Sequence, residues 1–149
     1  MNKPHYQYQT SADGQYYFFE SIGKNTIPKV VGYILRDEKS QLVELVFGDL
    51  IDNQRIDVMA VSDNQDLELV ITTVIDTLAD YLERFPEKTV YFQGSTPSRT
   101  RLYRAAIAKS LSQIEHLYEV FGVLPNDQLE TFNKSHHYQA YIIRKKYEI

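Results

Sequence analysis

The segment from Thr89 to Ile114 constrains the fold of this chain most strongly, because its pattern is that of a strand running directly into a helix. Apolar and polar side chains alternate over residues 89–93, which is the period of a β-strand. Thr96 and Pro97 then form a helix start, since threonine caps the free N–H groups of a first turn and proline at the next position needs no N–H. Apolar side chains continue at helical spacing through Leu102, Tyr103, Ala106, Ile107, Leu111 and Ile114. The chain is therefore expected to pair a sheet with helices.

A second helix is predicted before this segment. Ser62 and Gln65 have the spacing of a capping box, in which the two side chains bond to N–H groups at a helix start. From Leu67 to Phe85 the apolar residues recur at helical spacing. Pro86 ends the pattern, because proline lacks the N–H that a helix interior needs. One amphipathic helix thus precedes the short strand at 89–93 and another follows it.

Strand-like sequence occupies much of the rest of the chain. Strands are expected at Tyr16–Ile22, Lys29–Leu35, Leu42–Leu50, Leu117–Val123 and Tyr138–Arg144, with an irregular stretch through Phe132 before the last of them. The order β-β-β-α-β-α-β-β predicts an α+β fold, a two-layer sandwich in which a mainly antiparallel sheet carries both helices on one face. Only the strand that enters Gly94 needs a helical crossover to reach its neighbours. Residues 1–149 are expected to form a single domain, because this length supports one hydrophobic core.

Composition narrows the classes of protein to which this chain can belong. A net charge of −4 and a pI of about 5.5 argue against broad binding of duplex nucleic acid, which needs a strong positive field. The absence of cysteine excludes disulfides, thiolate catalysis and thiolate zinc sites. No stretch approaches the roughly 18 apolar residues of a membrane span, and the N-terminus shows no apolar signal core. A cytoplasmic protein without a membrane partner is therefore expected.

Aromatic residues are frequent, with 12 tyrosines and 7 phenylalanines. Such residues favour strands, and tyrosine is also common where a surface meets a partner. Two interpretations stay open. Either the rings pack at the edge of the core with their hydroxyls in water, or they cover an exposed sheet face through which the chain forms a homodimer.

The turn between the strand at 89–93 and the following helix is the candidate site for chemistry. N–H groups at a helix start lack partners within the helix, and the helix dipole places partial positive charge there. Gly94 would let a ligand approach the backbone closely. The hydroxyls of Ser95, Thr96 and Ser98 could donate hydrogen bonds to phosphate or carboxylate oxygens. The sequence therefore predicts an anion-binding corner.

Three arginines follow in the first two turns of this helix, and they differ in direction. On a helix drawn at about 100° per residue, Arg101 points away from the apolar stripe, Arg104 lies at its flank and Arg99 falls within it. A guanidinium that points inward needs an acceptor, so Arg99, and at its flank Arg104, join the predicted anion site. The other interpretation of Arg99 is a structural clamp on an internal carboxylate. The candidates for that carboxylate are Asp49, Asp52 and Asp57.

Other signals for chemistry are weaker. His136 and His137 would point to opposite sides of a strand, so no metal site is predicted. The Gly-Ser-Thr turn lacks the Gly-Lys-Ser/Thr ending of a P-loop and the spacing of a dinucleotide fingerprint, and no cofactor is predicted. A nucleophilic Ser95 or Thr96 would need a base that the sequence does not identify.

One long motif connects these residues to a known family. The segment Gly94–Arg104 reads Gly-Ser-Thr-x-x-Arg-Thr-Arg-Leu-Tyr-Arg, and it occurs with Phe47-Gly48-Asp49, Thr72-Thr73-Val74 and the closing Tyr138–Arg144. Over nearly its whole length the chain resembles a family of small proteins from Bacteroidota, the domain-of-unknown-function group 6934. The resemblance implies one domain in a bacterial cytosol and assigns no catalytic residue. It also looks like the kind of small protein that works beside a partner, including a two-gene toxin–antitoxin pair.

Three functions stay open on the sequence. The first is a non-enzymatic binding protein, in which the corner holds a phosphate-bearing ligand or an acidic segment of a partner. The second is a nuclease-like or phosphatase-like enzyme, with Arg99 stabilising developing charge and Tyr103 or a distant histidine moving a proton. The third is a homodimer built through the tyrosine-rich sheet.

Overall fold

The computed structural model describes residues 4–52, 55–57, 65–94, 96–114 and 116–146, and it contains two helices and one mostly antiparallel sheet. In chain order the elements are β1 (Gln9–Thr10), β2 (Tyr16–Ile22), β3 (Thr26–Asp37), β4 (Leu42–Asp52), β5 (Arg55–Asp57), α1 (Leu67–Arg84), β6 (Thr89–Phe92), α2 (Pro97–Ile114), β7 (Tyr118–Val123), β8 (Leu129–Thr131) and β9 (Ala140–Lys145). The α+β class that the sequence predicts is confirmed at this level.

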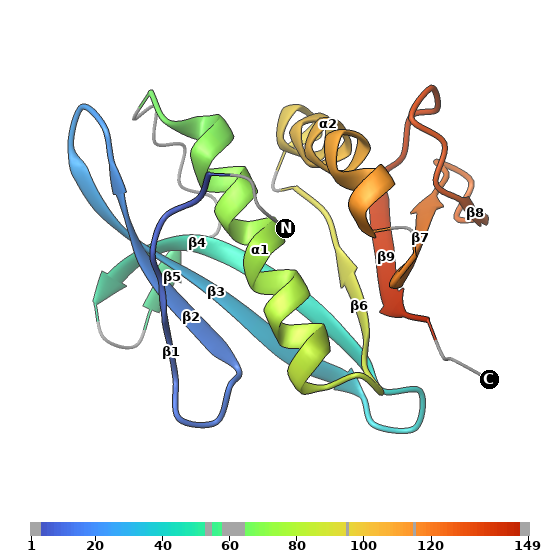
Figure 1. Ribbon diagram of the computed structural model, residues 1–149, viewed down its shortest axis with the longest axis horizontal. Coiled ribbons are helices and arrows are strands. Elements are labelled where there is room, and N and C mark those ends of the chain that lie inside the picture. Colours follow the sequence, from blue (N-terminus) through green and yellow to red (C-terminus); the bar gives the residue numbers. More distant parts are fainter. Residues whose placement is uncertain (1–3, 53–54, 58–64, 95, 115, 147–149) are drawn as a thin grey trace.

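The sheet has the strand order β1-β2-β3-β4-β6-β9-β7-β8, and β5 pairs with the end of β4 (Figure 1). Among the described strands only β4 and β6 pair in parallel, so α1 must cross over between them, as predicted for the strand that enters Gly94. β9 lies between β6 and β7 and is antiparallel to both, so β6 and β7 run in the same direction and α2 connects them. β6 pairs with the start of β4, over Leu42–Glu44, and the two helix starts lie close together, since Leu67 of α1 and Arg99 of α2 line one small cavity.

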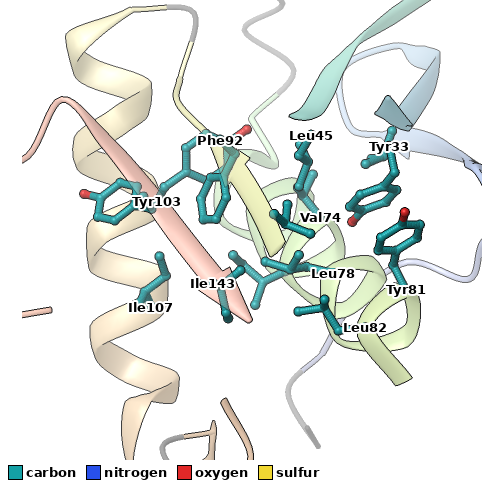
Figure 2. Close-up of a cluster of buried hydrophobic side chains, with 14 of the residues drawn as sticks. Tyr33, Leu45, Val74, Leu78, Tyr81, Leu82, Phe92, Tyr103, Ile107 and Ile143 are labelled. Carbon is teal, nitrogen blue, oxygen red and sulfur yellow. The ribbon is translucent and has the colours of Figure 1, made fainter. Parts of the chain in front are cut away.

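Both helices pack against the same face of the sheet. Tyr33 of β3 stacks on Tyr81 of α1 with ring centroids 4.1 Å apart, and Phe92 of β6 meets Tyr103 of α2 edge-on at 5.4 Å (Figure 2). The strand registers place Tyr33 and Phe92 on one side of the sheet. Val43 of β4 pairs with Leu35, two residues from Tyr33, and with Val90, two residues from Phe92, and side chains two residues apart on a strand point to the same face. Leucine, valine and isoleucine side chains fill the space between these aromatic pairs. A continuous apolar layer thus joins sheet and helices.

The structure corrects the expected order of elements at several points. β1 and β5 are additional short strands, and β8 lies in the stretch that was predicted to be irregular. The last strand begins at Ala140 rather than Tyr138, because residues 133–139 form a turn in which the His136 N–H donates to the Asn133 carbonyl. The structure confirms the end of α1, where the N–H of Phe85 still bonds to Tyr81 and Pro86 follows.

The predicted capping box at the start of α1 is wrong. Ser62 lies outside the described residues, and Gln65 has a φ of 63°, a left-handed conformation that cannot belong to the first turn of a right-handed helix. Asp66 occupies the N-cap position and makes no side-chain capping bond. Its carboxylate instead accepts hydrogen bonds at 2.5 Å from the hydroxyls of Tyr6 and Ser21. The helix start is therefore bound to the N-terminal segment and to β2.

Seven of the twelve tyrosines are buried, so core packing accounts for most of the aromatic content. Several tyrosine hydroxyls donate hydrogen bonds to side chains of α1: Tyr8 donates to Asp76 and Tyr17 to Asp80, each at 2.7 Å. Tyr33 donates to the Thr77 hydroxyl at 2.9 Å, since that hydroxyl itself donates to the Val74 carbonyl. These bonds satisfy the polar ends of rings whose bodies lie in the apolar layer.

The hydroxyl of Tyr81 differs, because the described residues provide no hydrogen-bond partner for it although it is buried. A buried hydroxyl without a partner loses its bonds to water and gains none. We expect Tyr81→Phe to leave the free energy of unfolding unchanged or to raise it by up to about 1 kcal/mol. The matched change Tyr33→Phe removes a satisfied hydroxyl and should lower it by about 1 kcal/mol. Urea denaturation of both variants measures the difference, and an equal loss in the two would contradict this account.

Candidate functional site

The corner between β6 and α2 is closed by contacts of its own backbone. Gly94 is buried, and its N–H donates to the Thr100 hydroxyl at 3.0 Å. A Cβ atom at this position would lie 2.4 Å from the backbone nitrogen of Thr100. Thr96 caps the helix as predicted, since its hydroxyl accepts a hydrogen bond from the N–H of Arg99 at 3.2 Å. Gly94 is thus needed for the close approach of the helix to the strand.

An open cavity of about 410 Å³ lies beside this corner. We call it the corner cavity. It is lined by Gln93, Gly94, Thr96, Pro97, Thr100, Arg101, Pro125, His137, Tyr138 and Gln139. None of these described lining residues carries a carboxylate, whereas a guanidinium and an imidazole are among them. The nearby carboxylates of Asp127 and Glu130, which are not among the lining residues, accept hydrogen bonds from Gln139 and Tyr138 of this wall.

The far wall of the corner cavity is the turn between β8 and β9, and α2 holds it in place. Arg104 donates through one Nη1 atom to the carbonyl of His136 at 3.1 Å and to Nδ1 of His137 at 2.7 Å. A guanidinium can only donate, so Nδ1 of His137 must accept. A neutral His137 then carries its proton on Nε2, which makes that nitrogen a hydrogen-bond donor.

The two histidines do not lie on a strand, which corrects the sequence interpretation. Both belong to the turn at 133–139, where His136 contacts the Glu130 carboxylate at 2.5 Å and Tyr138 donates to the same carboxylate at 2.6 Å. These two bonds, that of His136 first, lower the pKa of Glu130. Within the described part of the chain, histidines and acidic residues form no group that could hold a metal ion.

The structure separates the residues that the sequence assigned to one anion site. Gly94 and Thr96 line the corner cavity, while Ser95 lies outside the described residues. Ser98 accepts a hydrogen bond from Arg101 at 3.0 Å, and Arg104 supports the opposite wall. Sequence reasoning missed Arg101, His137 and the two glutamines of the wall. The position of Arg101 could have been predicted from the sequence, because this residue points away from the apolar stripe that forms the inner side of the helix.

Arg99 lies on the other side of the helix start, in a second cavity of about 20 Å³. Lys29, Phe47, Asp66, Leu67, Val70, Ile71 and Arg99 line it. This volume admits about one water molecule and is too small for a phosphate group. Arg99 and Thr96 therefore face different cavities, although three positions separate them in the sequence.

A buried ion pair lies next to Arg99. Lys29 is 5% exposed, and its ammonium bonds to the carboxylate of Asp49, its register partner on β4. The ammonium also lies 5.9 Å from the centre of the Phe47 ring. Asp49, which the sequence offered as a partner for Arg99, is thus bonded to a lysine that sequence reasoning passed over. Of the other two candidates, Asp57 pairs in register with Asp49, and the side chain of Asp52 lies outside the description.

Breaking this pair gives a test of its role in stability. Asp49→Asn removes the carboxylate to which the buried ammonium of Lys29 is bonded and should lower the free energy of unfolding by about 3 kcal/mol. Glu44→Gln is the matched control, because Glu44 of the same strand pairs with Arg36 of β3 on the exposed surface and should cost less than about 1 kcal/mol. Guanidinium denaturation compares the two variants. Equal, small losses would show that the Lys29–Asp49 pair is not a significant buried pair.

Comparison with known proteins identifies one family for this chain. Residues 2–146 match the model of a family of unknown function, DUF6934. Neither the curated proteins nor the solved structures contain a match to the chain. Among the described residues, neither helix has the length and apolar character needed to cross a membrane. Because the match spans almost every residue, the chain belongs to the DUF6934 family.

Proposed function

We propose that this protein is a non-enzymatic binding protein that holds a phosphate-bearing ligand, or an acidic segment of a partner protein, in the corner cavity. The observation that carries the proposal is the charge of the cavity wall. Arg101 and His137 line an opening of about 410 Å³ in which no described lining residue is acidic. The start of α2 adds the partial positive charge of its dipole at the same place. Following the expected compartment, the ligand is a cytoplasmic one.

The donors of the wall are arranged for binding. Ser98 accepts one hydrogen bond from Arg101 and so restrains its guanidinium, which has further N–H groups available for an oxyanion. Gln93 accepts the hydroxyl hydrogen of Tyr91 at 2.7 Å through Oε1, so its NH₂ group is a donor. His137 contributes the Nε2–H that its contact with Arg104 requires. Together these groups suit a phosphate, which accepts hydrogen bonds and presents none when fully ionised.

One observation favours the second candidate, an enzyme that processes phosphoesters. The structure brings His137 to the corner cavity, and a histidine was the group expected to move a proton. Its geometry supports binding instead, because a general base needs a free Nε2 lone pair, and that tautomer would set an Nδ1–H against the N–H of Arg104. Tyr103, the other expected proton carrier, is buried against Phe92, and burial raises its pKa to about 12.

Phosphate binding can be measured by NMR titration of the full chain with inorganic phosphate, adenosine monophosphate and a short RNA. We expect amide shifts at Gly94, Thr96 and His137, and an affinity at least about tenfold weaker in Arg101→Ala, since hydrogen bonds to charged groups contribute 1.5–3 kcal/mol. Arg36→Ala is the control, because it removes the same charge from an exposed pair on β3. Its affinity should stay within about twofold of the parent.

Three results would count against the proposal. The first is the absence of shifts around the corner cavity with all three ligands. The second is binding that is lost in Arg99→Ala and kept in Arg101→Ala, which would move the site to the small cavity beside Lys29. The third is phosphoester hydrolysis that disappears in both Arg101→Ala and His137→Ala while Arg36→Ala retains it, which would assign the enzyme instead.

A further inference from the structure

A third cavity, of about 210 Å³, lies between α1 and α2 and plays no part in the proposed function. We call it the interhelical cavity. Its apolar walls are formed by Leu67, Ile71 and Ile75 of α1 and by Leu102, Ala105 and Ala106 of α2. A protein cavity of about 150 Å³ with similar walls holds benzene, so this one has room for a ligand of one ring.

The cavity follows from how the sheet anchors the helices. α1 is bound over β3 through the stack of Tyr81 on Tyr33. α2 is bound over β6 and β9, since Tyr103 packs on Phe92 and the Tyr141 hydroxyl donates to the Thr100 carbonyl at 3.1 Å. The helices cannot close up without breaking these contacts, and alanines 105 and 106 are too small to fill the space between them. Leu67 remains 45% exposed at its edge.

The polar rim of the interhelical cavity carries a net negative charge. Glu68, Thr72 and Asp76 of α1 and Lys109 of α2 contribute to its lining. Lys109 bonds to the Glu68 carboxylate at 3.0 Å and offsets its charge. Asp76 accepts the hydroxyl hydrogen of Tyr8 at 2.7 Å and lies 3.5 Å from Nε2 of His5, and both contacts use Oδ2. The carboxylate of Asp76 therefore keeps acceptor capacity at Oδ1.

We propose that the interhelical cavity is a binding site for a small apolar amine. The ring or short chain of the amine lies against the isoleucine, leucine and alanine walls, and its ammonium group contacts Asp76. Charge selects this ligand class, because the lining carries two carboxylates and one ammonium, and an anion would be repelled by the carboxylate of Asp76, whose Oδ1 has acceptor capacity for an ammonium group. The corner cavity has the opposite preference, so the two sites are distinguishable by ligand charge alone.

The test uses the full chain and three one-ring probes of similar size that differ in charge: benzylamine, benzyl alcohol and benzoate. We expect benzylamine to shift the amides of Ile71, Ala105 and Ala106 and to bind at least about tenfold more tightly than benzoate, with benzyl alcohol between them. In Asp76→Asn, benzylamine should fall to the affinity of benzyl alcohol, whose own binding stays unchanged. Glu87→Gln removes an exposed carboxylate that does not line the cavity and should alter neither affinity.

A second variant tests the apolar walls. Ala106→Leu fills the cavity and should weaken benzylamine and benzyl alcohol alike by at least about tenfold. Its melting curve shows whether it folds, and Ala105→Leu replaces it if it does not, since Ala105 is exposed at the cavity edge. Benzoate binding equal to that of benzylamine, or benzylamine binding unaffected by Asp76→Asn, would overturn the proposal. So would self-association that Ala105→Glu abolishes, together with no benzylamine shifts, because a second copy would then be the occupant.

Discussion

The parallel pairing of β4 with β6 is the constraint on which the other features of this fold depend. Two parallel neighbours cannot be joined by a tight turn, so the chain between them must return along the sheet, and α1 makes that return. β7 runs in the same direction as β6, and α2 connects these two strands, while β9 lies between them. The starts of both helices lie close together, and the corner cavity, the small cavity beside Lys29 and the interhelical cavity all adjoin residues of these two helices.

Packing on one face of the sheet then decides how far apart the helices stand. Each helix is anchored by an aromatic pair to different strands, α1 through Tyr33 and Tyr81 and α2 through Phe92 and Tyr103. Because these rings are large and rigid, they contribute to the separation of the helices, which also contact each other through the ion pair of Glu68 with Lys109. The interhelical cavity is the space that this arrangement leaves. The buried Lys29–Asp49 pair lies in the sheet near the helix starts, since Lys29 lines the same small cavity as Leu67 and Arg99.

The cavities around these helices differ in the charge of their lining residues. The corner cavity presents Arg101 and His137 with no acidic lining residue among those described, whereas the interhelical cavity presents Glu68 and Asp76 against one lysine. The small cavity, which shares Leu67 and Ile71 with the interhelical cavity, combines Lys29 and Arg99 with Asp66 and has a volume of only about 20 Å³. The two proposals therefore place an anion at one end of α2 and a cation along its side, in a chain with an overall charge of −4.

The sequence by itself determined the features that depend on neighbours along the chain. Proline is unfavourable in a helix interior, so Pro86 predicts the end of α1, and Thr96 with Pro97 predicts the start of α2. Both boundaries and the α+β class could therefore be predicted. Only the tertiary structure decided that β9 separates β6 from β7, that Lys29 pairs with Asp49, and that Arg101 rather than Arg99 shares a cavity with Thr96. These results depend on segments distant in the chain, since His137 reaches the corner through a turn 33 residues after Arg104. A local sequence pattern does not indicate which distant strand or turn will lie next to a given side chain.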